Sequence, residues 1–266
     1  MGLHNALHEN SCRSPPLQAL AFRTPISYTR EPAFRSHLAV NLSLHTFASA
    51  TELDQAQATL VAGCLRAGLA EHGQAALALS GGRTPAGFFR ALSAASLDWS
   101  RIFVTLADDR CCEPASPHSN AASLATHLLQ GPAAAARFLP LYLADETPPQ
   151  RNARLAALPA QFDAVVLGMG EDGHTASIFP HSPQREAALY DATGHASLEV
   201  IGAAPVRERI TLTAARLLAT RNLILHITGQ RKWQVLGEAL QHTNPALPVS
   251  HFLHAQGPEK HVFWTR

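Results

Sequence analysis

Residues 168–177 contain the side chains most suited to acid–base chemistry in this sequence. The segment reads GMGEDGHTAS and directly follows an apolar run at residues 164–167. A histidine held at a strand end by neighbouring carboxylates can be fixed in one tautomer and act as a base near neutral pH. His174, preceded by Glu171 and Asp172, meets this description. The pattern therefore predicts general-base chemistry with His174 as the base.

The three glycines of this segment also satisfy the G-x-G-x-x-G spacing of dinucleotide-binding loops. Glu171 and Asp172 would then occupy the position that a doubly negative pyrophosphate must approach. Pro180 leaves little room for the long helix that should follow such a loop. The sequence therefore argues against nucleotide binding at this segment.

A second glycine-containing loop, SGGRTP at residues 80–85, lies between an apolar run and a helical stretch. Gly81 and Gly82 let a ligand approach the backbone closely, and amides at the start of a helix attract anions. Thr84 is a suitable cap, and Pro85 suits the first helical position. A phosphate-binding loop and an ordinary capped turn both fit this pattern. For a phosphate loop, the candidate residues are Ser80, Gly81, Gly82, Arg83 and Thr84.

Basic residues follow two other apolar runs. Arg110, after Asp108 and Asp109, could bind a phosphate through two hydrogen bonds or neutralise the two acids in an ion pair. Lys232 follows the run at residues 223–227 and is one of only two lysines among 21 basic residues. Its compact ammonium group suits a phosphate or a carboxylate. Asn120 and the serine before it begin a helical stretch, where they could serve only as a cap.

The composition argues against several classes of function. The formal net charge is +1 and no long basic run occurs, so we expect no nucleic-acid partner. No apolar run reaches membrane-spanning length, so we expect no membrane partner. The histidines lack metal-site spacing, the four cysteines form no C-x-x-C pair, and no G-x-S-x-G, P-loop or H-E-x-x-H motif occurs. These patterns predict a cytoplasmic protein whose chemistry needs no metal.

Short apolar runs alternate with alanine- and leucine-rich stretches from about residue 39 onward. The clearest predicted strands are residues 75–79, 102–106, 138–143, 164–167 and 223–227, and the clearest predicted helices are residues 52–71, 85–92, 121–129 and 232–240. Strands separated by crossover helices predict an α/β fold, a doubly wound and mainly parallel sheet with helices on both faces. In such folds ligands bind beyond the carboxyl ends of the strands. All four candidate segments lie at those ends.

Residues 1–38 differ from the rest of the chain. They contain four prolines and scattered histidines and arginines, with no sustained apolar period. We predict a flexible N-terminal extension over residues 1–38. A transit peptide is the alternative, because arginine outnumbers acidic residues there. Residues 39–266 are predicted to form a single α/β domain.

Together these segments resemble the 6-phosphogluconolactonase family, which belongs to a superfamily shared with glucosamine-6-phosphate deaminase/isomerase. The landmarks occur in the family's order and cover roughly residues 39–266. They are residues 80–82 with 84–85, 108–110 followed by 119–120, and 168–177, extended by 209–213 and by 228–229 with Lys232. The block at 168–177 is highly specific, whereas the loop at 80–85 alone is only moderately so.

The resemblance implies hydrolysis of 6-phospho-D-glucono-1,5-lactone to 6-phospho-D-gluconate in the oxidative pentose phosphate pathway. It implies His174 as the catalytic base, Asp172 as its orienting partner, and no metal or organic cofactor. It places the substrate phosphate near Gly81, Gly82, Thr84, Arg110 and Lys232. The expected substrate-binding set is completed by Ser80, Arg83, Asp108 and Asn120.

The sequence departs from the family pattern at two positions. Asp109 stands where the family usually has glutamate, and its shorter side chain leaves its role open. Arg83 occupies a position that is commonly small, which predicts an added charge near the phosphate.

Two other functions fit parts of the pattern. Amino-sugar-phosphate isomerases/deaminases typically carry Asn-Glu-Pro after the histidine block, where residues 178–180 of this chain read IFP and contain no acid. A non-catalytic sugar-phosphate-binding regulator would tend to lose His174 or Asp172, and both are present. The expected partner is therefore a phosphorylated sugar lactone, bound by a monomer or a homodimer.

Overall fold

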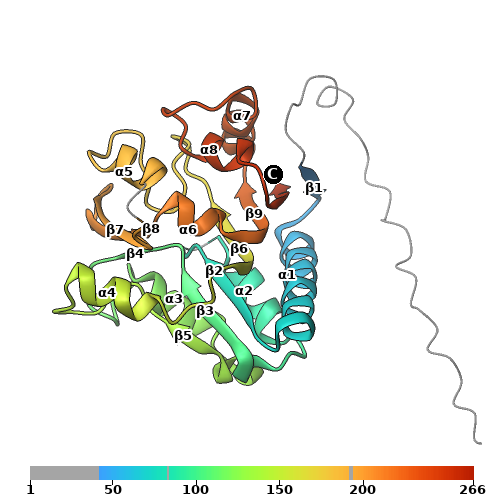
Figure 1. The fold of residues 1–266 in the computed structure, drawn as a ribbon. Helices are drawn as coiled ribbons and strands as arrows, with labels where there is room; N and C mark the ends of the chain where they lie inside the picture. Colours follow the sequence, from blue (N-terminus) through green and yellow to red (C-terminus); the bar gives the residue numbers. More distant parts are fainter. Residues whose placement is uncertain (1–41, 83, 192–193) are drawn as a thin grey trace, which may run out of the picture. The chain divides into compact units, whose positions relative to one another are not determined.

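The computed structural model describes residues 42–82, 84–191 and 194–266. The predicted extension at residues 1–38 lies outside the described residues, and so does Arg83 of the glycine-containing loop. Residues 42–266 form a seven-stranded sheet and a three-stranded sheet with helices packed against them (Figure 1).

The large sheet consists entirely of parallel strands in the order β1-β10-β9-β6-β2-β3-β5. Its central strands are mainly apolar because both faces are covered, and every residue of β2 is apolar and buried. The predicted parallel, doubly wound sheet is therefore confirmed. The strands are β1 (Ser43–Phe47), β2 (Ala75–Leu79), β3 (Ile102–Leu106), β5 (Arg137–Leu139), β6 (Phe162–Gly168), β9 (Thr220–Thr228) and β10 (Glu259–Thr265).

The order of the strands reverses in the middle of the sheet. From β2 the chain adds β3 and β5 towards one edge, whereas from β6 it adds β9 and β10 towards the other. Because crossovers are right-handed, the two halves place their helices on opposite faces. α1 contacts α2 and α2 contacts α3, while α7 contacts β9 and α8 (Figure 1). The helices are α1 (Ala50–His72), α2 (Ala86–Ser93), α3 (Asn120–His127), α4 (Pro148–Leu155), α5 (Arg185–Tyr190), α6 (Ala214–Leu218), α7 (Gln230–Ala239) and α8 (Val249–His254).

The reversal between β2 and β6 creates the place where ligands bind in such folds. The two strands are neighbours, and the backbone N–H of Ser80, just after β2, donates a 2.8 Å hydrogen bond to the carbonyl of Val166 in β6. The loops that follow these strands therefore diverge from one point at the carboxyl edge of the sheet. They are the two glycine-containing loops identified from the sequence.

The sequence does not predict the second sheet, which is antiparallel in the order β4-β8-β7. β4 consists of three charged residues without apolar alternation, so no periodicity marks it. It pairs with β8 so that Arg110 lies opposite Arg209. Ala107 joins the sheets, since its N–H donates to the Leu79 carbonyl and its carbonyl accepts from Leu212, each at 2.8 Å. The strands are β4 (Asp108–Arg110), β7 (Ser197–Ile201) and β8 (Glu208–Leu212).

The predicted strand at residues 138–143 is too long. The observed strand β5 ends at Leu139. The next residue is Pro140, which has no N–H to donate to a neighbouring strand, so the ladder stops there.

The expected capping role of Thr84 is also wrong. α2 begins at Ala86 with Pro85 as its N-cap residue, and no side-chain hydrogen bond is made from that position. Instead, Asp54 of α1 lies against this turn. Burial raises the pKa of Asp54, and a hydrogen bond from the Phe88 backbone partly offsets the rise. The Asp54 side chain therefore packs closely against the first turn of α2, where a Cβ atom at Gly87 would meet it.

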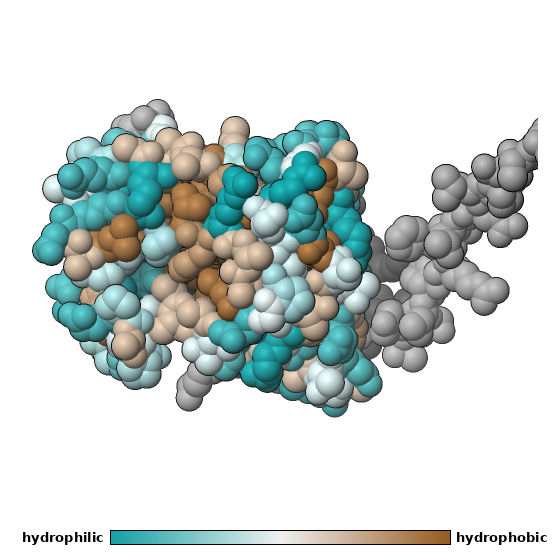
Figure 2. All heavy atoms as spheres, turned by 90° about the horizontal axis from the view of Figure 1, so that it is seen from below, coloured by the Kyte–Doolittle hydropathy of each residue, from teal (hydrophilic) through white to brown (hydrophobic). Residues whose placement is uncertain are grey.

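Most large apolar side chains of the described residues are buried, and those that are exposed include Leu44, Leu143 and Tyr190. Figure 2, a view from below Figure 1, shows apolar residues gathered towards the middle of that face and bordered by hydrophilic ones. Within residues 42–266 as described, no helix has the length and apolar character needed to cross a bilayer.

Candidate active site

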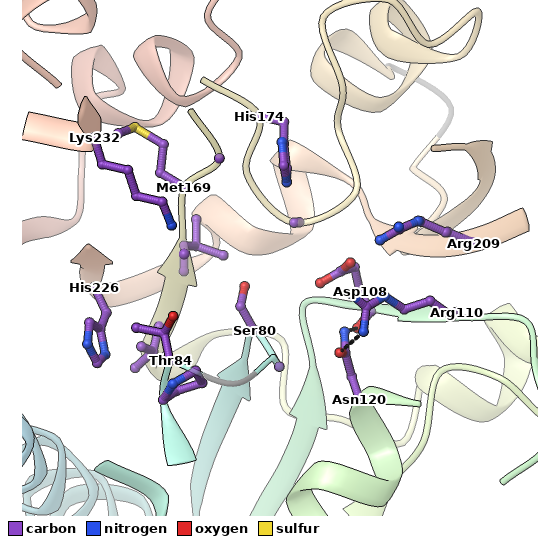
Figure 3. Close-up of a pocket in the computed structure, with 17 residues that line it drawn as sticks. Ser80, Thr84, Asp108, Arg110, Asn120, Met169, His174, Arg209, His226 and Lys232 are labelled. Carbon is purple, nitrogen blue, oxygen red and sulfur yellow. Dashed lines mark hydrogen bonds between the residues drawn. The ribbon is translucent and has the colours of Figure 1, made fainter. Parts of the chain in front are cut away.

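A pocket opens at the carboxyl edge of the large sheet, where loops from both halves of the fold meet (Figure 3). In Figure 3, the side chains of Lys232, His174 and Ser80 extend into one space from different sides. Arg209 approaches the same space from β8. The polar side chains that line the pocket are Ser80, Thr84, Asp108, Arg110, Asn120, His174, Arg209, His226 and Lys232.

The imidazole of His174, in the turn after β6, is held by Asp172. Nδ1 of His174 lies 2.6 Å from Oδ1 of Asp172, and the same oxygen accepts the His174 backbone N–H at 3.2 Å. Because a carboxylate accepts from Nδ1–H, the lone pair of the neutral ring is on Nε2. The side chain of His174 is 30% exposed. Its ring can therefore meet a ligand in the pocket.

Gly170 makes room for this pair. A Cβ atom at Gly170 would lie 2.2 Å from Nδ1 of His174 and 2.5 Å from Oδ1 of Asp172. The backbone N–H of Gly170 donates to the His174 carbonyl at 2.9 Å and closes the turn. The glycine spacing that mimics a dinucleotide motif thus accommodates an imidazole and a carboxylate.

The surroundings of His174 keep Asp172 ionised and the ring in place. Burial alone raises the pKa of the Asp172 carboxyl, but the hydrogen bonds and charge of His174 outweigh burial, and the pKa lies below its ordinary value. The Phe179 ring packs on His174 with 4.3 Å between the ring centroids. A carboxylate and an aromatic ring therefore fix the orientation of His174.

The loop after β2 presents a polar group without a partner. The hydroxyl oxygen of Ser80 lines the pocket, is buried, and has no hydrogen-bond partner among the described residues. Gly81 packs closely on α3, because a Cβ atom there would lie 2.3 Å from Cγ of Asn120. Buried hydroxyl groups normally have partners. Ser80 is therefore available to a ligand.

Asp109 positions the next part of the pocket. Its carboxylate accepts the backbone N–H groups of Arg110 at 2.8 Å, Asn120 at 2.7 Å and Ala121 at 3.2 Å. Burial raises the pKa of Asp109, while the hydrogen bonds from the backbone of Asn120 and Arg110 oppose the rise. Because Asn120 is the first residue of α3, Asp109 ties β4 to the start of that helix. The shorter acid at this position therefore has a structural role.

The ion-pair alternative for Arg110 is wrong. Its Nη1 donates to the His118 carbonyl at 2.8 Å and to Oδ1 of Asn120 at 2.6 Å. No ion pair among the described residues joins it to Asp108 or Asp109. Nε of Arg110 is buried and has no partner in the described part of the chain. Arg110 therefore brings a positive charge and a spare donor to the pocket.

Lys232 reaches the pocket from the first turn of α7. Its ammonium group points into the pocket in Figure 3. Burial lowers the pKa of Lys232, and the carboxylate of Glu171 opposes this shift. None of the ion pairs formed within the described segments involves Lys232. Its charge is therefore available to an anionic ligand.

Two polar side chains of the pocket, those of Arg209 and His226, were missing from the set predicted from the sequence. Arg209 belongs to a segment of the family pattern, but only the pairing of β8 with β4 places it in the pocket, where its guanidinium lies 5.2 Å from the Phe179 ring centroid. His226 lies near the carboxyl end of β9 and is close enough to Lys232 for their charges to interact. A signal for His226 existed, since it is a polar residue inside the apolar run 223–227.

The structure brings most members of the predicted site together. Asp172 lies behind His174 rather than on the pocket wall, and Gly82 does not line the pocket either. The predicted residues that line the pocket are Ser80, Gly81, Thr84, Asp108, Arg110, Asn120, His174 and Lys232.

No cluster of three or more His, Cys, Asp or Glu able to hold a metal occurs in the part of the chain that the structure describes.

Comparisons with known proteins extend over nearly the whole described domain. The family model for glucosamine-6-phosphate isomerases/6-phosphogluconolactonase matches residues 48–264. A protein of Rhizobium meliloti named 6-phosphogluconolactonase is 40% identical over 232 residues, which are 85% of this chain and 99% of that protein. A protein of Pseudomonas aeruginosa with the same name is 42% identical over 223 residues, 82% of this chain and 94% of its own length.

The structural comparison agrees with the sequence comparison. The crystal structure of a 6-phosphogluconolactonase from Shewanella baltica superimposes with a TM-score of 0.82 at 34% identity, covering 86% of this chain and 100% of that one. The family model and these relatives each cover far more than half of the chain. The chain belongs to the glucosamine-6-phosphate isomerase/6-phosphogluconolactonase family.

Proposed function

We propose that this chain is a lactone hydrolase that converts 6-phospho-D-glucono-1,5-lactone to 6-phospho-D-gluconate in the oxidative pentose phosphate pathway. The observation that carries the proposal is the 2.6 Å contact between His174 and Asp172 beside a pocket with unpartnered polar groups. The relatives that bear the name 6-phosphogluconolactonase match along nearly their whole length, which supports the same activity here.

In the proposed reaction, Nε2 of His174 takes a proton from water while the water oxygen attacks the lactone carbonyl carbon. The bond between that carbon and the ring oxygen then breaks, and the imidazolium returns the proton to the departing oxygen. The products are a carboxylic acid, which ionises, and a free hydroxyl group. Asp172 keeps the proton on Nδ1 and stabilises the imidazolium between the two steps.

Substrate binding orients the lactone towards His174. The proposed phosphate ligands are Lys232 and Ser80, together with Thr84 and the backbone of the 80–85 loop. Among the described residues, Lys232 forms no ion pair and the Ser80 hydroxyl has no hydrogen-bond partner. Holding the phosphate fixes the carbonyl against the attacking water, which lowers the entropic part of the barrier. The remaining proposed substrate-binding residues are Asp108, Arg110 and Asn120 on another side of the pocket (Figure 3).

The proposal includes the setting of the enzyme. We place it in the cytoplasm, acting on a phosphorylated sugar lactone as a monomer or homodimer without a metal. Three cysteines of the described residues, Cys64, Cys111 and Cys112, are free thiols, which fits a reducing compartment.

The test is acid release from freshly generated 6-phosphogluconolactone, followed against spontaneous hydrolysis. Replacing His174 with Ala should lower kcat by about 10²–10⁴-fold, because general-base catalysis is lost, while binding of 6-phosphogluconate is retained. His181→Ala, which changes an exposed histidine outside the pocket, is the matched control.

Each contrary outcome has a defined meaning. An unchanged kcat in His174→Ala would show that His174 is not the general base. Turnover of an amino-sugar phosphate without lactone hydrolysis would favour the isomerase/deaminase alternative. Tight 6-phosphogluconate binding with hydrolysis no faster than the spontaneous reaction would favour a regulator.

A further inference from the structure

His226 is a buried histidine in the pocket wall that the proposed reaction does not use. Its residue surface is 6% exposed, and it lines the pocket together with Lys232 and Ser80. In the parallel register it is paired with Gly168, the last residue of β6. Because Gly168 leads into the loop that carries His174, His226 lies at the same edge of the sheet as the proposed base.

The ring of His226 has an unused hydrogen-bonding group. Nδ1 is buried and has no partner among the described residues. By contrast, the ring of His254 has a partner, because its Nε2 lies 3.1 Å from the Ala239 carbonyl. An unpartnered buried nitrogen costs free energy that an apolar residue of similar size would avoid. Nε2 of His261 is likewise buried without a partner among the described residues but lies outside the pocket, so it is the place of His226 in the pocket wall beside Lys232 that indicates a ligand.

The charge beside His226 indicates what kind of ligand would complete it. Burial and the positive charge of Lys232 lower the pKa of His226 to about 4, so the ring is neutral near pH 7. A neutral imidazole has one N–H donor and one lone pair. An ammonium group and a ring N–H lining one pocket can bind one anion, the first through its charge and the second through a directed hydrogen bond.

We propose that His226 is a phosphate-binding residue: its ring donates a hydrogen bond to an oxygen of the substrate phosphate, which is held by Lys232. A phosphate placed there supplies the partner that the ring lacks. The identity of the phosphorylated substrate rests on the proposed function, but the affinity for phosphate itself does not. His226 then selects phosphorylated ligands and takes no part in proton transfer.

The test compares His226→Leu, which removes both ring nitrogens, with His226→Gln, which keeps an N–H donor. The Kd for inorganic phosphate and for 6-phosphogluconate is measured by calorimetry, and KM and kcat are measured with 6-phosphogluconolactone. His226→Leu should raise both Kd values and KM about tenfold or more, as expected for loss of a hydrogen bond to a charged group. Its kcat should change by less than about threefold, and His226→Gln should have the smaller loss of affinity.

The matched control is His261→Leu. His261 is a half-buried histidine on β10 whose Nδ1 lies 3.3 Å from Nε2 of His45, outside the pocket. The Kd for phosphate should be unchanged in this variant. A second readout needs no substitution. The ring nitrogen resonances of His226 in the unmodified protein should shift as inorganic phosphate is added, and the Kd fitted to this shift should equal the calorimetric Kd.

Three results would overturn the proposal. They are an unchanged phosphate Kd in His226→Leu, equal losses in His226→Leu and His261→Leu, or no shift of the His226 ring resonances at saturating phosphate. Failure of the lactonase function is a separate result, since a protein without that activity would still bind inorganic phosphate in a His226-dependent manner.

Discussion

His174 and Asp172 are only two residues apart, and the contact between them is built inside one turn. Gly170 leaves space for both side chains, and Gly173 adopts a φ of 77° that most residues avoid. The turn is closed by a hydrogen bond between the Gly170 N–H and the His174 carbonyl. The orientation of the proposed base therefore depends on local sequence, and it is sensitive to any added atom.

Gly170→Ala is the sharpest residue-scale test of this geometry. The new methyl group would meet Nδ1 of His174 at 2.2 Å, so the imidazole must move. A displacement of this size should lower kcat by about 100-fold, because catalysis depends on the alignment of the base with the attacking water. Steady-state lactone hydrolysis measures the loss. Thermal unfolding of the same variant shows whether the fold is retained.

The control for Gly170→Ala is Gly63→Ala, at an exposed position in α1 with open space around the added methyl group. Its kcat should equal that of the unmodified protein. A Gly170→Ala enzyme with normal kcat would show that His174 does not need its observed orientation.

At the scale of elements, α1 depends on a close approach to β6. Gly68 in α1 faces Asp163 of β6, whose Oδ2 accepts the Ala76 N–H at 2.8 Å and so joins β6 to β2. Burial raises the pKa of Asp163, and the hydrogen bond from Ala76 opposes that rise. The absence of a side chain at Gly68 therefore allows a helix to pack over a buried carboxyl group.

Two alanine substitutions in α1 should have opposite effects on stability. At Gly68, a Cβ atom would lie 2.3 Å from Oδ1 of Asp163, so Gly68→Ala should lower the free energy of unfolding by about 1–3 kcal/mol. At exposed Gly63 nothing lies within 4 Å, so Gly63→Ala should raise it by about 0.5–1 kcal/mol through helix propensity. Denaturant unfolding of both variants is the measurement. Equal changes in the free energy of unfolding of the two variants would contradict the close contact between position 68 and Asp163.

At the scale of the whole molecule, one half-buried histidine, His45, and one buried histidine, His226, make stability depend on pH. The pKa of His45 is lowered to about 4 by burial and by the nearby His261, and that of His226 to about 4 by burial and by Lys232. Both are near 6.5 in an unfolded chain. The unfolded state therefore binds more protons between these values, and the folded state loses stability as the pH falls from about 6.5 to about 4.

We expect the Tm to fall between pH 7 and pH 4.5, and His45→Phe to reduce that fall. Phenylalanine can keep the stacking of residue 45 on Phe263, whose ring centroids lie 4.5 Å apart, and it removes one titrating group. Thermal unfolding at several pH values is the measurement, with His181→Phe as an exposed control. If the Tm of His45→Phe fell with pH as steeply as that of the unmodified protein, His45 would not contribute to the pH dependence.

Local patterns in the chain were sufficient to predict the parallel sheet, its edge that carries the site, and the loop of His174. Strands buried on both faces are rich in apolar residues, so the apolar runs within β2, β3, β6 and β9 can be recognised from the sequence. The contact between His174 and Asp172 and the hydrogen bond that closes the Gly170–His174 turn are equally local, although the Val249 N–H also donates to the Gly173 carbonyl at 3.0 Å.

Long-range pairing determined the rest. β4 has no apolar signal, and only its register with β8 brings Arg209 opposite Arg110 in the pocket. The role of Asp109 depends on backbone amides of α3, and the unpartnered nitrogen of His226 can be recognised only once its neighbours are in place. Such contacts join residues far apart in the chain, and their energies depend on burial and register, which local periodicity does not encode.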